Sequence, residues 1–315
     1  MSFDFDEIID RRNTNSLKYD FAVERGKPAG ILPLWVADMD FRTPPCVVDA
    51  LRRSSEHGIF GYTAAKPDDV AILLNWFDRR FRWAIDPDWL VRTPGVIYAL
   101  ATAIRSLTKP GDSILIQQPV YYPFNRVISV NQRKVVNSPL ICEDNRYVLD
   151  FADFERKIRD ERVRMFILCN PHNPVGRVWS RVELERLGDI CAAYHVVLVS
   201  DEIHADFIYP GNKHVVLADI KPSFQDITIT CTAPSKTFNL AGLQIANIVI
   251  ANPDLRRAFR REMDQEGYGQ VNTMGLVACQ AAYRDGQAWL EELLAYLGGI
   301  LTRAIRQIRD AIRTQ

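Results

Sequence analysis

Three polar side chains follow apolar, strand-like runs at widely separated points of the chain. Asp201 ends the run VVLVSD, Lys236 follows ITITCTAPS, and Asn173 lies in the turn NPHNPVG after RMFILC. A buried carboxylate is costly unless a cation pairs with it, and a lysine between hydroxyl groups suits imine formation beside a bound phosphate. Taken singly, the same residues are a helix cap or ion pair, a surface charge and a turn residue. Their chemistry depends on whether the fold brings them together.

The elements around these residues alternate between strand and helix character. Strands are predicted over 112–117, 164–169, 196–200 and 227–231, and helices over 96–107 and 181–195. This alternation predicts an α/β fold with a mainly parallel sheet, in which ligands bind at the carboxyl ends of the strands. We therefore expect a site made by four segments that follow strands, namely 118–124, 170–176, 201–206 and 232–239.

Composition indicates an ordinary globular protein. Of 315 residues, 47% are hydrophobic and 25% charged, and 39 basic residues balance 39 acidic ones, which gives no reason to expect a nucleic-acid or membrane partner. The N-terminus carries no apolar signal stretch, and no apolar run approaches the roughly 20 residues of a membrane span. We expect a cytoplasmic protein. Its six cysteines lack CxxC or other metal-ligand spacing, and most of them are interpreted as buried thiols.

Several other functions are disfavoured by the motifs. The strings SKT and DEIH resemble parts of a P-loop helicase, but GxxxxGK[ST] is absent and the lysine follows the acidic motif. No GxGxxG fingerprint of a dinucleotide-binding domain occurs. A metal site at Asp201, His204 and Asp206 is a weaker interpretation than three polar loop residues, so no metal is predicted.

Together the motifs resemble one family over most of the chain. PLWVADMDF, FGYT, TPGVIYAL, PVYYPF, NPHNPVGRVW, SDEIHADF and SKTFNLAGLQ occur in order. They resemble the fold-type I aminotransferase superfamily (class I/II), which depends on pyridoxal 5′-phosphate (PLP), and most closely its MalY/PatB-like cystathionine β-lyase group. The resemblance implies an aspartate-aminotransferase-like fold with a three-layer α/β/α large domain. It implies an N-terminal arm and small-domain segment over 1–45, a PLP-binding domain over 46–285, and an interdomain helix with an incomplete small domain over 286–315.

The resemblance also implies roles around the cofactor ring. Lys236 would bind PLP covalently and act as the catalytic base, and Asp201 would pair with the ring nitrogen. Asn173 would hydrogen-bond the phenolic oxygen, with His204 nearby, and Tyr121 would stack on the ring.

Further residues are implied around the phosphate. Val96 and Ile97 would offer backbone N–H groups at a helix N-terminus, and Ser235 would add a hydroxyl. Tyr62 would reach the phosphate in the neighbouring subunit of a homodimer. Gln244 stands where other aminotransferases of the superfamily have a phosphate-binding arginine, which favours the lyase group.

The implied activity is carbon–sulfur β-lysis of cystathionine or another cysteine conjugate to a thiol, pyruvate and ammonia. An amino-acid aminotransferase shares all the cofactor residues and stays open as an alternative. A non-catalytic relic of the fold is the third hypothesis.

The C-terminal segment departs from the family pattern. Residues 286–315 carry a helical apolar stripe that includes Leu290 and Ile312, and Gly298–Gly299 should weaken or bend that helix. The resemblance fades after Leu297, before the family's arginine for the substrate carboxylate. We expect a folded large domain with poor turnover and a tendency to aggregate. The tail arginines, Arg303, Arg306, Arg309 and Arg313, are interpreted as a solvated face.

Overall fold

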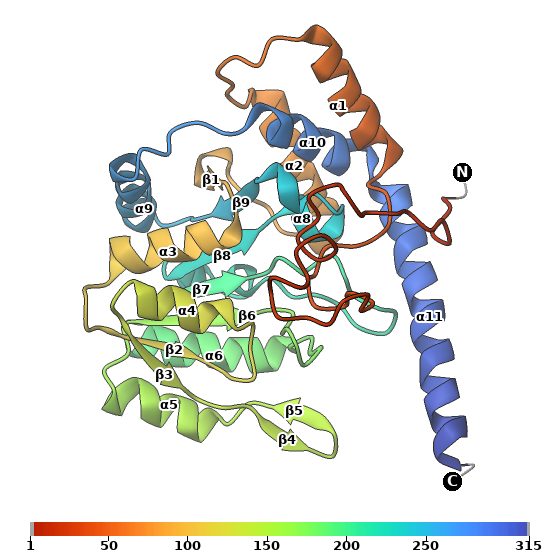
Figure 1. The fold of residues 1–315 in the computed structure, drawn as a ribbon. Coiled ribbons are helices and arrows are strands. Elements are labelled where there is room, and N and C mark those ends of the chain that lie inside the picture. The colour runs from red at the N-terminus through yellow and green to blue at the C-terminus, as the bar shows by residue number, and fades with distance from the viewer. Residues whose placement is uncertain (1–2, 314–315) are drawn as a thin grey trace.

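A computed structural model describes residues 3–313, with side chains over residues 3–307. Its centre is a seven-stranded sheet in the order β1-β9-β8-β7-β6-β2-β3 (Figure 1). Strand β9 runs antiparallel to both of its neighbours, and the other pairs are parallel. The strands are β1 (Leu90–Thr93), β2 (Ser113–Ile116), β3 (Lys134–Asn137), β6 (Met165–Cys169), β7 (Val197–Asp201), β8 (Thr228–Thr232) and β9 (Ala246–Val249).

The central strands are buried on both faces, which explains why they are runs of apolar residues instead of alternating patterns. In β6, Met165 and Ile167 face one core while Phe166 and Leu168 face the other. The four strands predicted from the sequence correspond to β2, β6, β7 and β8, each shifted by at most one residue at either end. The prediction of a mainly parallel α/β sheet is confirmed.

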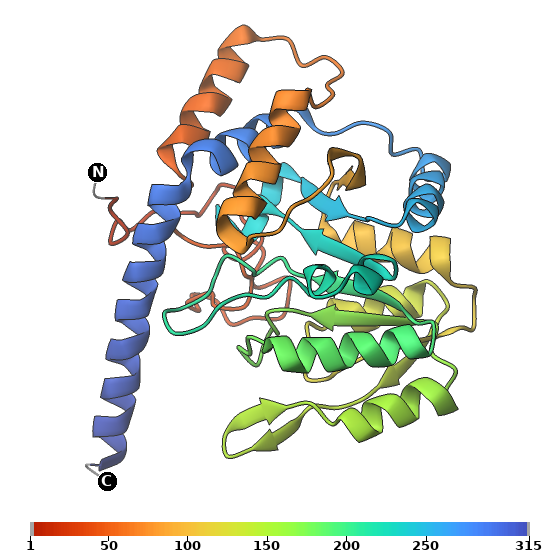
Figure 2. The same ribbon diagram turned by 180° about the vertical axis from the view of Figure 1, so that it is seen from behind.

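Helices cover both faces of this sheet. Three helices pack on the face seen in Figure 1, namely α3 (Val96–Leu107), α4 (Pro123–Val130) and α9 (Pro253–Gln265). Three lie on the opposite face, seen in Figure 2, namely α5 (Phe151–Asp160), α6 (Arg181–Ala193) and α7 (Pro222–Gln225). Gly188 permits the close approach of α6 and α7, since an added Cβ would lie 2.4 Å from the Phe224 ring. The result is the predicted three-layer arrangement.

A third apolar core lies beside the β1 end of the sheet. It is formed by α1 (Pro45–His57), α2 (Pro67–Phe81), α10 (Thr273–Asp285) and the first turns of α11 (Gln287–Arg313). The remaining elements are short. They are the hairpin β4 (Ile141–Glu143) and β5 (Arg146–Val148), the helix α8 (Pro234–Thr237) and the 3-10 turns η1 (Pro87–Trp89), η2 (Leu217–Asp219) and η3 (Ala241–Leu243).

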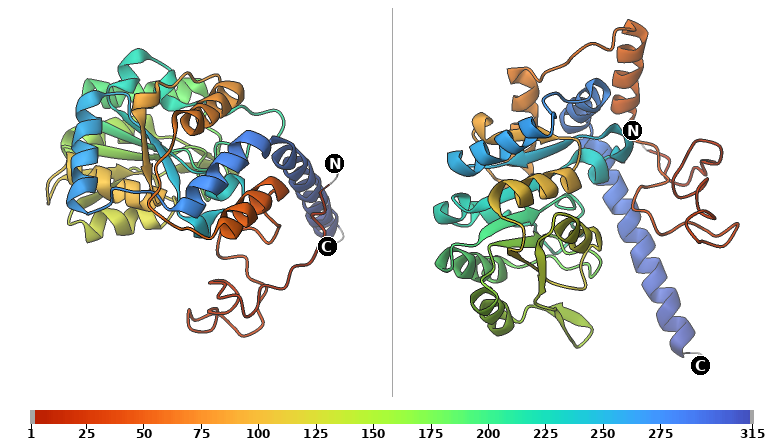
Figure 3. Two further views of the ribbon diagram at one scale, coloured as in Figure 1. Left: turned by 90° about the horizontal axis from the view of Figure 1, so that it is seen from above. Right: turned by 60° about the vertical axis from the view of Figure 1, so that its left-hand side comes forward.

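Helix α11 leaves the body of the molecule along its length (Figures 1 and 3). Leu290 and Leu293 are fully buried, whereas Leu301 and Ile305 are exposed. The helix is continuous through Gly298–Gly299, so the pair does not interrupt it. Arg303 and Arg306 are exposed, as predicted for a solvated face. Three further predicted positions, Ile312, Arg309 and Arg313, lie outside the side chains that the structure describes.

The N-terminal segment of the chain is irregular. Residues 3–44 contain neither helix nor strand, and helix α1 begins at Pro45. The division into an arm, a large domain and a terminal helix is compatible with these bounds and stays a prediction. Over residues 3–313, no helix has the length and apolar character needed to cross a bilayer.

Candidate active site

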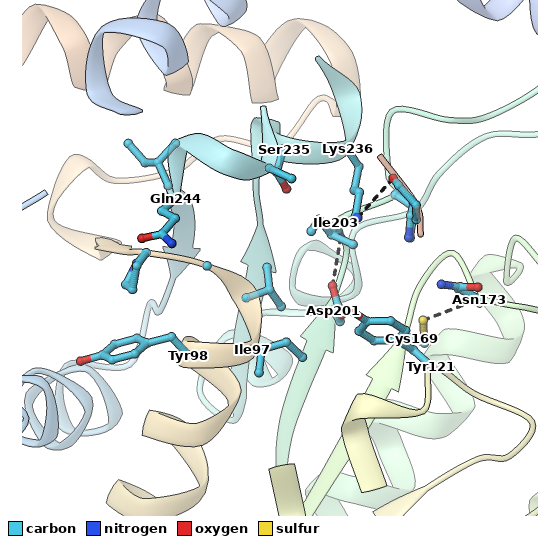
Figure 4. A pocket seen from close by; sticks show the side chains of 17 residues that line it. Ile97, Tyr98, Tyr121, Cys169, Asn173, Asp201, Ile203, Ser235, Lys236 and Gln244 are labelled. Atoms are coloured by element: carbon cyan, nitrogen blue, oxygen red, sulfur yellow. Dashed lines mark hydrogen bonds between the residues drawn. The ribbon is translucent and has the colours of Figure 1, made fainter. Parts of the chain in front are cut away.

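A cavity of about 440 Å³ opens at the carboxyl ends of β6, β7 and β8 (Figure 4). This is the edge of the sheet where the segments after the strands were predicted to meet, and the volume suits a cofactor-sized ligand. Eight of the nine cofactor residues predicted from the sequence line it: Val96, Ile97, Tyr121, Asn173, Asp201, His204, Ser235 and Lys236. The exception is Tyr62.

Asp201 is the last residue of β7 and is buried at the cavity wall. Burial raises the pKa of Asp201 to about 7, the charge of Glu202 adds to this rise, and Lys236 opposes it. One carboxylate oxygen accepts the N–H of Ile203 at 3.2 Å. Among the described residues, no basic side chain forms an ion pair with Asp201. A cation bound in the cavity would supply that partner, so this carboxylate fits the protonated ring nitrogen of PLP.

Lys236 lies in helix α8, four residues after the end of β8, and its side chain enters the cavity. Burial lowers the pKa of its amine, opposed by the charges of Asp38 and Asp201. The amine Nζ donates to the carbonyl oxygen of Ala37 at 3.4 Å. A lysine that is partly desolvated in this way is a better nucleophile and base near neutral pH than a surface lysine.

The helix that carries Lys236 is anchored by a buried acid. Thr237 Oγ1 donates to Asp206 Oδ2 at 2.8 Å, and Arg80 Nε donates to Asp206 Oδ1 at 3.2 Å. Asp206 therefore contacts α2 and α8 and does not line the cavity. Its position separates it from Asp201 and His204 and accords with its interpretation as a polar structural residue.

The turn after β6 places Asn173 beside the cavity. Its N–H donates to Cys169 Sγ at 3.3 Å, and Nε2 of His172 lies 3.0 Å from the carbonyl oxygen of Pro119. That second contact ties the turn to the segment that carries Tyr121. Burial raises the pKa of the Cys169 thiol, which keeps it protonated next to Asp201.

The rings of Tyr121 and His204 complete the cavity wall near Asp201. Tyr121 is half-buried and packs edge-to-face on Phe124, with ring centroids 5.8 Å apart. Burial, with a smaller contribution from the charge of Lys236, lowers the pKa of His204 to about 4. His204 is therefore neutral at physiological pH and offers a hydrogen bond without a charge.

The far end of the cavity is the N-terminus of α3. Gly95 is its N-cap residue and supplies no side chain to cap the first N–H groups, and Gly95, Val96 and Ile97 all line the cavity. Val96 and Ile97 begin the helix as predicted, and a helix N-terminus attracts a phosphate group. Ser235 and Gln244 line the same cavity. Gln244 has a left-handed backbone with φ of 50°.

The cavity is also lined by residues to which the sequence assigned no role, among them Ala37, Tyr98, Cys169 and Ile203. Cys169 is the last residue of a predicted strand, so the expectation that ligands bind at the carboxyl ends of the strands would have identified it. Ala37 lies in an irregular segment without periodicity, and only the two aspartates of WVADMDF marked that segment as polar.

Tyr62 lies outside this cavity. It stands in the loop between α1 and α2 and is 95% exposed, beside the exposed Ile59 and Phe60. In a single chain it contributes nothing to the wall around Lys236. Its predicted role in the neighbouring subunit stays a prediction.

The mixed sheet, with a lysine and an unpaired buried aspartate at its carboxyl edge, defines the fold of the PLP-dependent aminotransferases. The chain belongs to the aminotransferase class I and II family, whose profile matches residues 29–311.

Three similar proteins show which members of the family this chain resembles. Cystathionine beta-lyase PatB of Bacillus subtilis (strain 168) is 42% identical over 293 residues, which are 93% of this chain and 76% of that protein. A PLP-bound putative aminotransferase from Clostridium difficile 630 matches with a TM-score of 0.95 and 43% identity, covering 98% of this chain and 80% of that one. A PLP-bound C-S lyase from Staphylococcus hominis matches with a TM-score of 0.91 and 35% identity, covering 97% and 77%.

Proposed function

We propose that the chain binds PLP in the cavity around Lys236 and cleaves the carbon–sulfur bond of cystathionine or a related cysteine conjugate. The observation that carries the proposal is a buried Asp201, without an ion-pair partner among the side chains described, in the same cavity as Lys236. The buried carboxylate of Asp201 requires a cationic partner, and the amine of Lys236 suits a carbonyl partner. PLP has both, in its protonated ring nitrogen and its aldehyde group. The 42% identity to a cystathionine beta-lyase supports lysis over amino-group transfer.

Asp201 and Lys236 have separate roles in the proposed reaction. Bound PLP supplies an electron sink for the electron pair that the α-proton leaves behind. With PLP bound, Asp201 would hold the positive charge on the ring nitrogen, and Lys236 Nζ would accept the α-proton. The bond from Cβ to sulfur then breaks, and sulfur takes the electron pair and a proton to leave as a thiol. Water converts the remaining fragment to pyruvate and ammonia.

The other residues orient the cofactor in this proposal. Tyr121 would pack on the ring, and Asn173 and neutral His204 would contact its oxygen side. The start of α3 and Ser235 would hold the phosphate. These roles are supported by the shared cavity and by the helix N-terminus that faces it.

The proposal is tested with the purified chain incubated with PLP and cystathionine. We expect pyruvate, ammonia and thiol in equal amounts, and borohydride reduction should fix PLP on Lys236. The variant Lys236→Ala should lose at least about a thousandfold in rate, since one group serves both as nucleophile and as base. The control Lys109→Ala changes an exposed lysine that precedes β2, at the opposite edge of the sheet.

Two results would contradict the proposal. A chain that takes up no PLP has no such cofactor site. Stoichiometric conversion of an added keto acid to an amino acid, without thiol release, would identify an aminotransferase instead.

We also propose a homodimer in which Tyr62 of one subunit completes the partner's site. The proposal is supported by the exposed aromatic and aliphatic side chains of its loop, since Phe60 and Ile59 are 62% and 70% exposed.

A further inference from the structure

Residues 35–41, here called the strap, run beside Lys236 without belonging to a helix or strand. Ala37 lines the cavity, and its carbonyl oxygen accepts the hydrogen bond from Lys236 Nζ (Figure 4). An irregular segment has no ladder of backbone hydrogen bonds to fix it. The position of the Ala37 carbonyl therefore depends on the side chains that hold the strap.

The inner side of the strap is held from the lysine's own segment. Asn239 follows Lys236 by three residues, and its side-chain oxygen accepts the N–H of Met39 at 3.0 Å. Its amide nitrogen donates to the carbonyl oxygens of Met39 at 3.0 Å and Phe41 at 2.8 Å. The strap and Lys236 are thus linked through one asparagine side chain.

The outer side is held by two basic residues of the N-terminal arm. Arg11 pairs with Asp38 at 2.5 Å and with Asp40 at 2.7 Å. Lys18 Nζ donates to the carbonyl oxygen of Asp38 at 2.8 Å and to the Asp40 carboxylate at 3.0 Å. Only 4% of the Lys18 side chain is exposed, and a buried ammonium group requires such partners.

We propose that Asn239, Arg11 and Lys18 form a clamp that positions the strap, so that the Ala37 carbonyl orients the Lys236 amine for proton transfer. The inference rests on the proposed function and names positioning residues for it. Contacts from both sides fix the strap, while the lysine contact is a single hydrogen bond. A shift of about 1 Å in such a group lowers a rate by up to about a hundredfold.

The outer side is tested by Arg11→Gln against the matched control Arg12→Gln. Arg12 is the next residue and is 76% exposed, and within the described part of the chain its guanidinium pairs only with Asp10, at 3.9 Å. In the PLP-loaded chain, Arg11→Gln should accelerate hydrogen exchange of the strap amides and lower kcat/KM about tenfold or more, mainly through kcat. Arg12→Gln should match the unmodified chain in both measurements.

The inner side is tested by Asn239→Gly, which serves if Arg11→Gln folds poorly. Asn239 has a φ of 58°, so glycine keeps the left-handed backbone and removes only the amide side chain. Asn145→Gly in the β4–β5 turn, with a φ of 60°, is the matched control. The two clamp variants should show the same kinetic defect, and the control should show none.

A readout without turnover separates the clamp from the proposed function. In the cofactor-free chain, acetic anhydride should label Lys236 severalfold faster in the clamp variants, with Lys109 as internal reference. Equal labelling of Lys236 in clamp and control variants overturns the proposal. Faster strap exchange with unchanged kcat and pH profile also overturns it, because the clamp would then only stabilise the arm. An unmodified chain without PLP binding would contradict the proposed function, while the labelling still decides the clamp.

Discussion

At the scale of single residues, burial shifts the pKa values of Asp201 and Lys236 in opposite directions. It raises the pKa of the carboxyl group and lowers the pKa of the amine, so both neutral forms are favoured in the cofactor-free cavity. Sequence patterns placed both residues at strand ends, and the family resemblance assigned their roles. The burial that sets their pKa values depends on side chains from distant segments, such as Ala37, and could not be predicted from either motif alone.

Asp201 should make the stability of the cofactor-free chain depend on pH. Its pKa is about 7 in the folded chain and near 3.8 when exposed, so the folded state holds a proton that the unfolded state releases. The free energy of unfolding should therefore fall by up to about 1.4 kcal/mol per pH unit between pH 4 and 7, relative to Asp201→Asn. Above pH 7 the difference should level off.

Urea unfolding of both cofactor-free chains at several pH values measures this difference. Other buried acids, such as Asp206, are common to both chains and cancel. Parallel stability curves for the two chains would show that Asp201 is ionised in the folded state and has a cationic partner.

At the scale of elements, the sequence predicted four of the seven strands of the main sheet, β2, β6, β7 and β8, because each is a short apolar run buried on both faces. The helices over 96–107 and 181–195 are confirmed as α3 and α6, the second ending two residues earlier. Strands β1, β3 and β9 were not predicted. The antiparallel direction of β9 was not predicted either, because apolar content carries no information on strand direction. The strap was also missed, since an irregular segment leaves no periodic pattern.

A substitution of Gly95, at the N-terminus of α3, should affect stability and PLP affinity in opposite directions. Gly95 has an extended backbone, and no atom lies within 4 Å of the position that an added Cβ would occupy, so Gly95→Asp fits sterically. An aspartate there caps the helix and interacts favourably with its dipole, so it should stabilise the cofactor-free chain by roughly 0.5–1 kcal/mol. The same charge repels a phosphate, so the affinity for PLP should fall about tenfold or more.

Thermal unfolding and PLP titration measure the two effects separately. Gly95→Asn is the control, because it caps the same N–H groups without a charge, so the difference in PLP affinity between the two variants measures the charge repulsion alone. Equal PLP affinity in the aspartate and asparagine variants would mean that the phosphate lies elsewhere.

At the scale of the whole molecule, the exposed loop with Tyr62 and the cavity with Lys236 are separate features of one chain. Tyr62 lies beside Arg260 and Tyr268 in a second hollow and does not line the cavity around Lys236. The sequence alone predicted Tyr62 as a cofactor residue only through the family resemblance, which assigned it to a neighbouring subunit. A site shared between two subunits leaves no pattern in a single chain.

Mixing two inactive variants tests whether the sites are shared. Lys236→Ala lacks the catalytic lysine, and Tyr62→Ala lacks the residue proposed to act on the partner. In a heterodimer of the two, one site has neither residue and the other has both. If subunits exchange at random, about half of the dimers are mixed and about a quarter of the sites are intact, so about a quarter of the unmodified rate should return. Each variant alone should stay impaired, and Lys236→Ala mixed with Lys236→Ala,Tyr62→Ala should gain nothing. If Tyr62 acts within its own chain, the mixture can only equal the average of its components, and the proposed dimeric site is wrong.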